Sequence, residues 1–221
     1  MLSDFEIFAV ADASGSGVKI ALVRGGRTVS EAARPDMAME GFASALKEVC
    51  GPVLDGIGAF ALCVGPGSML STRVASCAVS TIAALTGAKL FSWDAMLTAA
   101  AALSRGFVGG FPEMRGDFRI LAPSRKGYVN ALDFRGGAAA RQEEVEIGAL
   151  AAMDSLPTAM LDQRAEVDPR LAGFKRLGLP AGAAARALLA DPGLAEPCAF
   201  APEPKSLSKR EYAKWKAQAR I

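Results

Sequence analysis

The sequence of 221 residues contains no histidine, and this absence excludes more chemistry than any other feature of its composition. Histidine is the commonest general base, the partner of serine in hydrolytic triads and a frequent metal ligand. The four cysteines, Cys50, Cys63, Cys77 and Cys198, stand singly, with no Cys-x-x-Cys pair of the kind that binds zinc or forms a redox dithiol. We therefore expect reduced thiols, no bound metal and no catalytic triad.

The chain also lacks a strong charge of either sign and a long uninterrupted apolar run, and we expect no N-terminal signal peptide. Its net charge is +2, with 22% charged and 51% hydrophobic residues, which is typical of a globular protein and says little about partners. Asp4 and Glu6 lie where a signal peptide would be cationic or apolar. The weakly polar stretch 74–88 is interrupted by serine and threonine and is short for a membrane span. We expect a cytoplasmic protein that does not enter the membrane.

Strand and helix patterns alternate over the first hundred residues. An apolar run of strand length at 59–64 is typical of a strand covered on both faces. The next helix should begin after Ser68 as its N-cap and end before Gly87, and Asp94 should cap another helix. The patterns predict strands at 6–11, 18–23 and 28–33, a helix at 40–54, the central strand at 59–64, and helices ending near 86 and 104.

The second half of the chain is less regular. The glycine-rich stretch 106–116 has the composition of a hinge. We therefore expect two lobes, residues 1–105 and a smaller lobe of residues 106–221 whose basic tail could pack back on the first. Strands are predicted at 118–122, 128–134, 143–147 and 158–161, a helix at 181–190, and an extended connector at 197–204.

The first turn carries the first candidate for anion binding. The predicted order of elements matches the beginning of the actin-like ATPase (ASKHA, ribonuclease H-like) fold: a strand, an Asp-x-Ser-x-Ser turn, two further strands, a crossover helix and a strand. This is an α/β fold of two lobes with mixed sheets flanked by helices. In that fold the first hairpin can present backbone N–H groups to a phosphate. Asp12, Ser14 and Ser16 occupy this turn. The alternative is a tight turn whose side chains bond their own backbone.

A second candidate lies between the central strand and the following helix. Gly65, Gly67 and Ser68 surround the N-terminus of that helix, where free N–H groups and the helix dipole favour an anion. The spacing matches neither a Walker loop nor a dinucleotide fingerprint. The alternative is close packing of helix on strand, where glycine provides room.

The helix at 69–86 has no charged residue beyond Arg73, so something should cover its outer face. The helix at 95–104 is equally small and uncharged, and the pair could form a flat patch for another subunit. The alternative is that the second lobe covers it. The candidate interface comprises Met69, Arg73, Ser76, Cys77, Ser80, Met96 and Ala99.

Six cations with two aromatic residues, Tyr212 and Trp215, distinguish the end of the chain. Such a segment could follow a phosphate backbone, or it could be a solvated helix with its aromatic side chains packed on the protein. The cations are Lys205, Lys209, Arg210, Lys214, Lys216 and Arg220.

With these motifs in place, the chain resembles the TsaB (YeaZ) family of tRNA threonylcarbamoyladenosine biosynthesis proteins, as a divergent member. Residues 64–73, Val-Gly-Pro-Gly-Ser-Met-Leu-Ser-Thr-Arg, are similar to the family's Gly-Pro-Gly-Ser-Phe-Thr-Gly-Leu-Arg signature, and residues 87–97 are similar to the segment that follows it. Residues 203–215 are similar to the family's tail. Met69 to Thr72 depart from the signature, and Ser206 and Ser208 replace the usual tyrosine and arginine.

The resemblance implies a non-catalytic scaffold subunit for the t6A37 modification of tRNA. Such proteins pair with the catalytic paralogue TsaD and assemble with the ATPase TsaE, form homodimers when alone, and meet tRNA indirectly. It implies no cofactor for the chain itself, with ATP or ADP entering only with the complex. Two other interpretations stay open: a homodimeric interaction module, and a small-molecule kinase or phosphate-binding protein of the same superfold. The family's older label of glycoprotease fits less well, because the sequence has no metal ligands or evident nucleophile and base.

Overall fold

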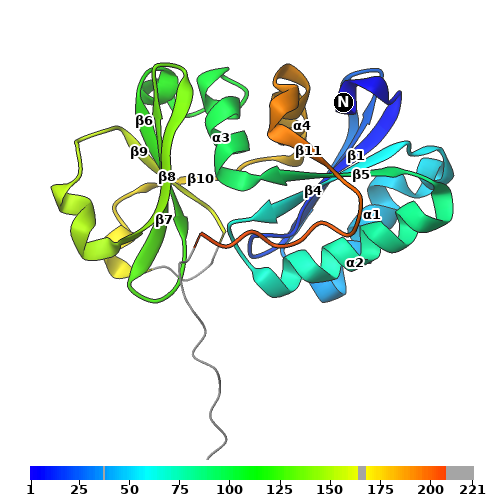
Figure 1. Cartoon of the computed structure of the whole chain (residues 1–221), viewed down its shortest axis with the longest axis horizontal. Helices are drawn as coiled ribbons and strands as arrows, with labels where there is room; N and C mark the ends of the chain where they lie inside the picture. Colours follow the sequence, from blue (N-terminus) through cyan, green and yellow to red (C-terminus); the bar gives the residue numbers. More distant parts are fainter. Residues whose placement is uncertain (37, 164–167, 208–221) are drawn as a thin grey trace, which may run out of the picture.

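Two mixed β-sheets lie side by side in the computed structural model, which describes residues 1–36, 38–163 and 168–207 (Figure 1). The first sheet has the order β11-β5-β4-β1-β2-β3 and the second the order β10-β9-β6-β7-β8. The first sheet comprises β1 (Ile7–Asp12), β2 (Val18–Arg24), β3 (Arg27–Arg34), β4 (Ala59–Gly65), β5 (Lys89–Asp94) and β11 (Ala195–Cys198). The second comprises β6 (Phe118–Pro123), β7 (Tyr128–Arg135), β8 (Ala138–Glu146), β9 (Thr158–Leu161) and β10 (Lys175–Leu177).

The two sheets repeat one topology. In each, the first three strands form an antiparallel meander, and the next two lie parallel to the first strand on its other side. The first sheet gains one further strand, β11, which pairs antiparallel with β5. This doubled arrangement is the actin-like ATPase fold predicted from the sequence.

Four α-helices cover the two faces of the first sheet. Helices α1 (Ala38–Cys50) and α2 (Met69–Thr86) lie on one face, and α3 (Ala95–Ser104) and α4 (Ala181–Ala190) lie on the other, next to the second sheet (Figure 1). Side chains of β1 alternate accordingly, because successive residues of a strand point to opposite faces. Phe8 packs with α3 and α4, whereas Ala9 packs with α1 and α2.

The caps of the two central helices are confirmed. Ser68 Oγ accepts a hydrogen bond from the Ser71 N–H, and Gly87 ends α2 in the left-handed conformation with φ 79°. The Asp94 carboxylate accepts from the N–H groups of Met96 and Leu97 at the start of α3.

Other predicted elements differ from the structure. The first helix ends at Cys50, and residues Gly51–Gly56 form a 3-10 turn that contains Pro52. Strand β8 begins at Ala138 and not at 143, because Gly136 and Gly137 adopt positive φ and close a tight hairpin directly after β7.

Helices α2 and α3 do not form the single flat patch that the sequence predicts. Helix α2 lies beside α1, on the face of the sheet opposite α3. By length and mean hydropathy alone α2 could cross a membrane. However, it connects the parallel strands β4 and β5 of one sheet, and six of its side chains are buried. Crossing a membrane would therefore break this β-α-β unit.

Candidate functional site

The predicted anion-binding residues meet where β1, β4 and β5 end. The carboxyl ends of parallel strands form the usual ligand crevice of open α/β sheets. Asp12 ends β1 and Asp94 ends β5, and both carboxylates are buried, at 8% and 7% exposure. We call this region the strand-end site.

The first turn is closed on itself. Both the N–H and the hydroxyl of Ser14 donate to Asp12 Oδ1, at 2.8 and 2.7 Å. Ser16 lies on the exposed side of the turn. The two residues that could have bound a phosphate thus bond each other, which is the alternative that the sequence left open for this turn.

The second loop packs directly on the first. The Ser68 N–H at the start of α2 donates to the Ser14 carbonyl over 2.7 Å. A Cβ atom on Gly67 would lie 2.2 Å from that carbonyl oxygen, so only glycine fits there. Gly67 therefore allows close packing of the two loops, and at least one N–H of the helix N-terminus is already occupied.

Gln163, which the sequence did not single out, connects the second lobe to both loops. Its side-chain N–H₂ donates to the Pro66 carbonyl at 2.5 Å and to Ser14 Oγ at 3.4 Å. The side chain is 7% exposed, and its Oε1 has no partner among the described residues. Because Gln163 is about a hundred residues from Pro66 in the chain, no local sequence pattern could have indicated this contact.

The strap, as we name residues 199–207, crosses the strand-end site (red in Figure 1). The Lys205 N–H donates to the Val64 carbonyl at 2.7 Å, and Ser76 Oγ donates to the Pro202 carbonyl at 2.6 Å. The Lys205 ammonium reaches Asp94 Oδ2 at 2.7 Å. The chain itself therefore occupies the mouth of the strand-end site.

Asp94 is the most connected group of the site. One carboxylate oxygen caps α3, and the other accepts from Lys205 and from the amide of Gln142 at 3.1 Å. Gln142 belongs to β8, so the carboxylate joins both lobes and the strap. A buried carboxylate needs such partners, since an unpaired one would be costly.

Cys63 lies beneath the loops and is unsuited to act as a nucleophile. Its thiol donates to Ser14 Oγ at 3.5 Å. Burial, and then the nearby negative charge of Asp12, raise the pKa of Cys63 well above its ordinary value. A thiol is reactive as the thiolate, which this environment disfavours. In the described part of the chain, no cluster of three or more cysteine and acidic side chains could hold a metal ion.

The predicted interface residues separate into two groups. Met69, Arg73 and Cys77 lie on the exposed outer side of α2. The other four are less accessible: Ser76 lies beneath the strap, Ser80 is half-buried, and Met96 and Ala99 are fully buried between the lobes. The Ser80 hydroxyl oxygen is buried and has no hydrogen-bond partner in the described part of the chain. Met96 and Ala99 therefore do not lie on any surface of the folded chain, because the second lobe covers α3.

A hollow separates α1 from α2 on the outer face of the first lobe. Its volume is about 640 Å³, and its walls are mostly apolar. The lining includes Phe42, Leu46, Pro52, Leu54, Ala78 and Ile82. Two leucines of α2 are exposed, Leu70 at 59% and Leu85 at 82%. We call the outer sides of these two helices, with the hollow, the α1–α2 face.

Solved structures show what this architecture is similar to. A protein from Pseudomonas aeruginosa, described as similar to the peptidase YeaZ, superposes with a TM-score of 0.65 at 15% identity, covering 92% of this chain and 100% of that one. YeaZ from the same organism superposes with a TM-score of 0.61 at 14% identity, covering 87% and 96%. The chain has the fold of YeaZ. No protein-family model matches the sequence, and no curated relative was found for it.

The YeaZ likeness spans both lobes. The matched regions take in nearly all of each Pseudomonas chain and about nine-tenths of this chain, so the likeness is not confined to one sheet. At this identity the likeness establishes the fold, and the roles of individual residues rest on the geometry described above.

Proposed function

We propose that the chain is a non-catalytic subunit of the t6A37 tRNA modification machinery in the cytoplasm, and that it pairs with a TsaD-like catalytic partner. The observation that carries this proposal is the YeaZ likeness over 92% of a chain whose own strap crosses its strand-end site. A TsaE-like ATPase would join that complex, tRNA would be met through it, and ATP or ADP would enter at that level.

The filled strand-end site counts in favour of a partner role over a kinase role. A phosphate at the first turn would have to displace the Ser14 contacts with Asp12 and Ser68. It would also have to displace Lys205 from Asp94. Each lost contact to a charged group costs about 1.5–3 kcal/mol.

The α1–α2 face is the surface we assign to pairing. It combines an apolar hollow with exposed Leu70, Leu85 and Met69 and lacks charge along α2 beyond Arg73. An apolar centre of this kind is what subunit interfaces bury. Of the two test positions that the sequence suggests, Ser76 lies beneath the strap and Ser80 is half-buried. Cys77 is exposed and Ile82 lines the hollow, so we use these two positions instead.

The test is co-purification of the tagged chain with the TsaD-like protein of its own host. The proteins that are recovered with it are identified by mass spectrometry. Cys77→Arg and Ile82→Glu should each abolish recovery of the partner, because a charge would be buried at the interface. Ala149→Arg, at an exposed position in the second lobe, is the matched control and should leave recovery unchanged.

Two outcomes would count against the proposal. Recovery of the bait alone as a stable homodimer, sensitive to the same two substitutions, would favour the homodimeric interaction module. Unchanged pairing in both α2 variants would remove the α1–α2 face from the interface.

A further inference from the structure

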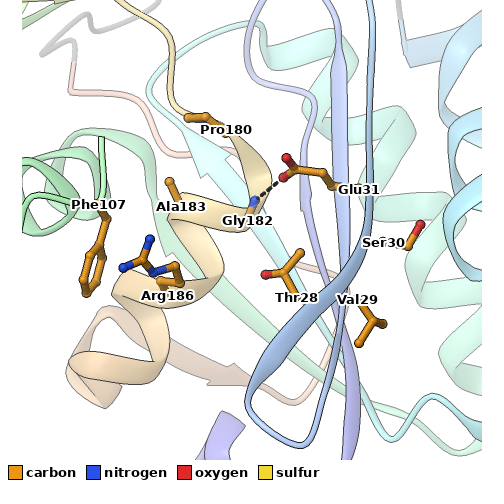
Figure 2. Close-up of a pocket in the computed structure, with 9 residues that line it drawn as sticks. All are labelled: Thr28, Val29, Ser30, Glu31, Phe107, Pro180, Gly182, Ala183 and Arg186. Atoms are coloured by element: carbon orange, nitrogen blue, oxygen red, sulfur yellow. Dashed lines mark hydrogen bonds between the residues drawn. The ribbon is translucent and has the colours of Figure 1, made fainter. Parts of the chain in front are cut away.

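A second surface lies on the opposite side of the first sheet, where β3 forms its free edge beside α4. A shallow hollow of about 510 Å³ separates the strand from the helix (Figure 2). A second hollow, of about 360 Å³, continues along the strand. Glu31 and Pro180 line both, so the two form one groove, which we call the β3 groove.

The groove reaches the outer edge of β3 as well as the face of the sheet that α4 covers. Residues 28–33 all line it, although successive side chains of a strand point to opposite faces. Val29 is the extra residue of a β-bulge, since Thr28 pairs with Val23 and Ser30 with Leu22. This bulge lets Thr28 and Glu31 both point towards α4 (Figure 2). Six residues of strand measure about 20 Å, the length of an extended hexapeptide.

The strand side of the groove offers backbone hydrogen bonds. Alternate N–H and C=O groups of an edge strand point away from its neighbour, so an added strand can pair with them. The other free edges are less suited to this: β10 has three residues, β11 contains Pro197, and β8 carries an ion pair between Arg141 and Glu143. β3 has eight residues and a hollow beside it.

The helix side is rigid and mostly apolar. The Glu31 carboxylate accepts a hydrogen bond from the Gly182 N–H at 2.9 Å, which fixes the start of α4 against β3 (Figure 2). A Cβ atom on Gly182 would lie 2.7 Å from that carboxylate oxygen. Pro180, Ala183 and the ring of Phe107 form the rest of this wall.

The charge of the groove is positive. The Arg186 guanidinium lies over the Phe107 ring, 4.1 Å from its centroid, and Lys19 lines the other end. Neither cation makes an ion pair with a residue that the structure describes. The one acidic residue of the lining, Glu31, is already engaged with the helix N-terminus.

We propose that the β3 groove binds an extended acidic peptide segment of a partner protein by strand addition to β3. Backbone pairing would supply affinity, as in other cases of β-augmentation. Acidic side chains would meet Lys19 and Arg186, and apolar ones would enter the hollows beside Phe107 and Pro180. This site is independent of the proposed function, because it lies across the sheet from the α1–α2 face.

The experiment is selection of a random linear octapeptide display library on the full chain. We expect enrichment of sequences that alternate apolar residues with Asp or Glu. The best peptide, labelled with fluorescein, is then titrated by anisotropy. The double variant Lys19→Glu and Arg186→Glu should weaken it at least about tenfold, and Arg186→Gln alone by a few-fold. Arg115→Glu, at an exposed arginine elsewhere, is the matched control and should change affinity by less than about twofold.

Two further variants locate the site. Thr28→Arg should block the hollow, and a proline in the middle of the peptide should abolish binding because it removes a backbone donor. Ile82→Glu should leave the peptide affinity unchanged even where it abolishes pairing. Failure to enrich acidic sequences, or equal binding by the double charge variant, would overturn the proposal. Displacement of the peptide by inorganic phosphate at matched ionic strength would also overturn it, since it would indicate a site for small anions. Matching thermal unfolding curves establish that the variants are folded.

Discussion

Arg119 and Asp133 form the most deeply buried ion pair among the described residues. Their side chains are 5% and 7% exposed, and two hydrogen bonds of 2.5 and 3.0 Å join them across β6 and β7. A third donor of Arg119 reaches the Asp154 carbonyl at 3.1 Å. Satisfying all these groups offsets the cost of removing two charges from water.

Removing one partner should therefore be far more harmful than removing both. Asp133→Ala should lower the free energy of unfolding by about 3–5 kcal/mol, because an uncompensated guanidinium stays buried. Arg119→Met combined with Asp133→Leu should recover most of this loss. Urea denaturation measures both, and a double variant no more stable than the single one would contradict the argument.

Two buried thiols should make the fold sensitive to alkaline pH. Burial raises the pKa of Cys50 from 9.0 to about 12, and that of Cys63 well above its ordinary value. Between about pH 9 and 12 the unfolded chain has lost these protons while the folded chain keeps them, so rising pH favours unfolding. Over this range the Cys50 thiol should lower the free energy of unfolding by about 1.4 kcal/mol per pH unit, and the Cys63 thiol should act in the same direction.

The measurement is urea denaturation at several pH values above about 8.5. Cys50→Ala should show a shallower fall than the unsubstituted chain, and the difference between the two curves should grow with pH. Parallel curves would show that Cys50 ionises equally well in the folded protein.

At the scale of elements, the sequence predicted well those helix ends that depend only on nearby residues. Ser68, Gly87 and Asp94 set the ends of α2 and α3 through caps that involve only nearby residues. Strand β11 was not predicted, because Pro197 and Glu196 disfavour a strand and its pairing with β5 is about a hundred residues away in sequence. The sequence identified the two loops of the strand-end site. It could not indicate Gln163, Gln142 or the strap, because these reach the site only through the tertiary fold.

The contact between the two loops is the element that Gly67→Ala would break. A Cβ at this position would meet backbone, which cannot move aside like the end of a flexible side chain. We expect a loss of about 2–4 kcal/mol in the free energy of unfolding, as for other overpacked sites with a lost hydrogen bond. Gly56→Ala, where a Cβ would meet open space, should cost less than about 1 kcal/mol.

The strap can be tested as an element through Lys205. Lys205→Met keeps the apolar stem but leaves Asp94 Oδ2 with Gln142 as its one remaining partner among the described residues. Amide exchange should then become faster around Ser76 of α2, where the strap contacts the helix. Unchanged exchange in this region would show that the backbone contact to Val64 alone holds the strap. Residues 208–221, which include Tyr212, Trp215 and most of the basic residues of the tail, lie outside the described part of the chain. Their binding to a phosphate backbone therefore stays a prediction.

At the scale of the whole molecule, two glutamine side chains join the lobes at the strand-end site. Gln142 reaches Asp94, and Gln163 reaches Pro66 and Ser14. Helices α3 and α4 fill the space above them with alanine and leucine side chains. The lobes therefore share one apolar core, and we expect them to unfold together.

Calorimetry tests this expectation. A single transition, with equal calorimetric and van't Hoff enthalpies, is expected for the unsubstituted chain. Gln163→Ala should lower its midpoint by several degrees, because it leaves Ser14 Oγ and the Pro66 carbonyl with fewer partners. Two separate transitions would show that each lobe is stable without the other.

The position of β11 and the strap in the chain has a consequence for synthesis. A ribosome completes β1 to β5 and α3 early, and it then makes the whole second lobe before residues 195–207 emerge. Until then β5 is an unpaired edge and the Asp94 carboxylate lacks its cation. The nascent first lobe therefore lacks its last strand throughout synthesis of the second sheet, and β11 closes the structure only after all the other strands have been made.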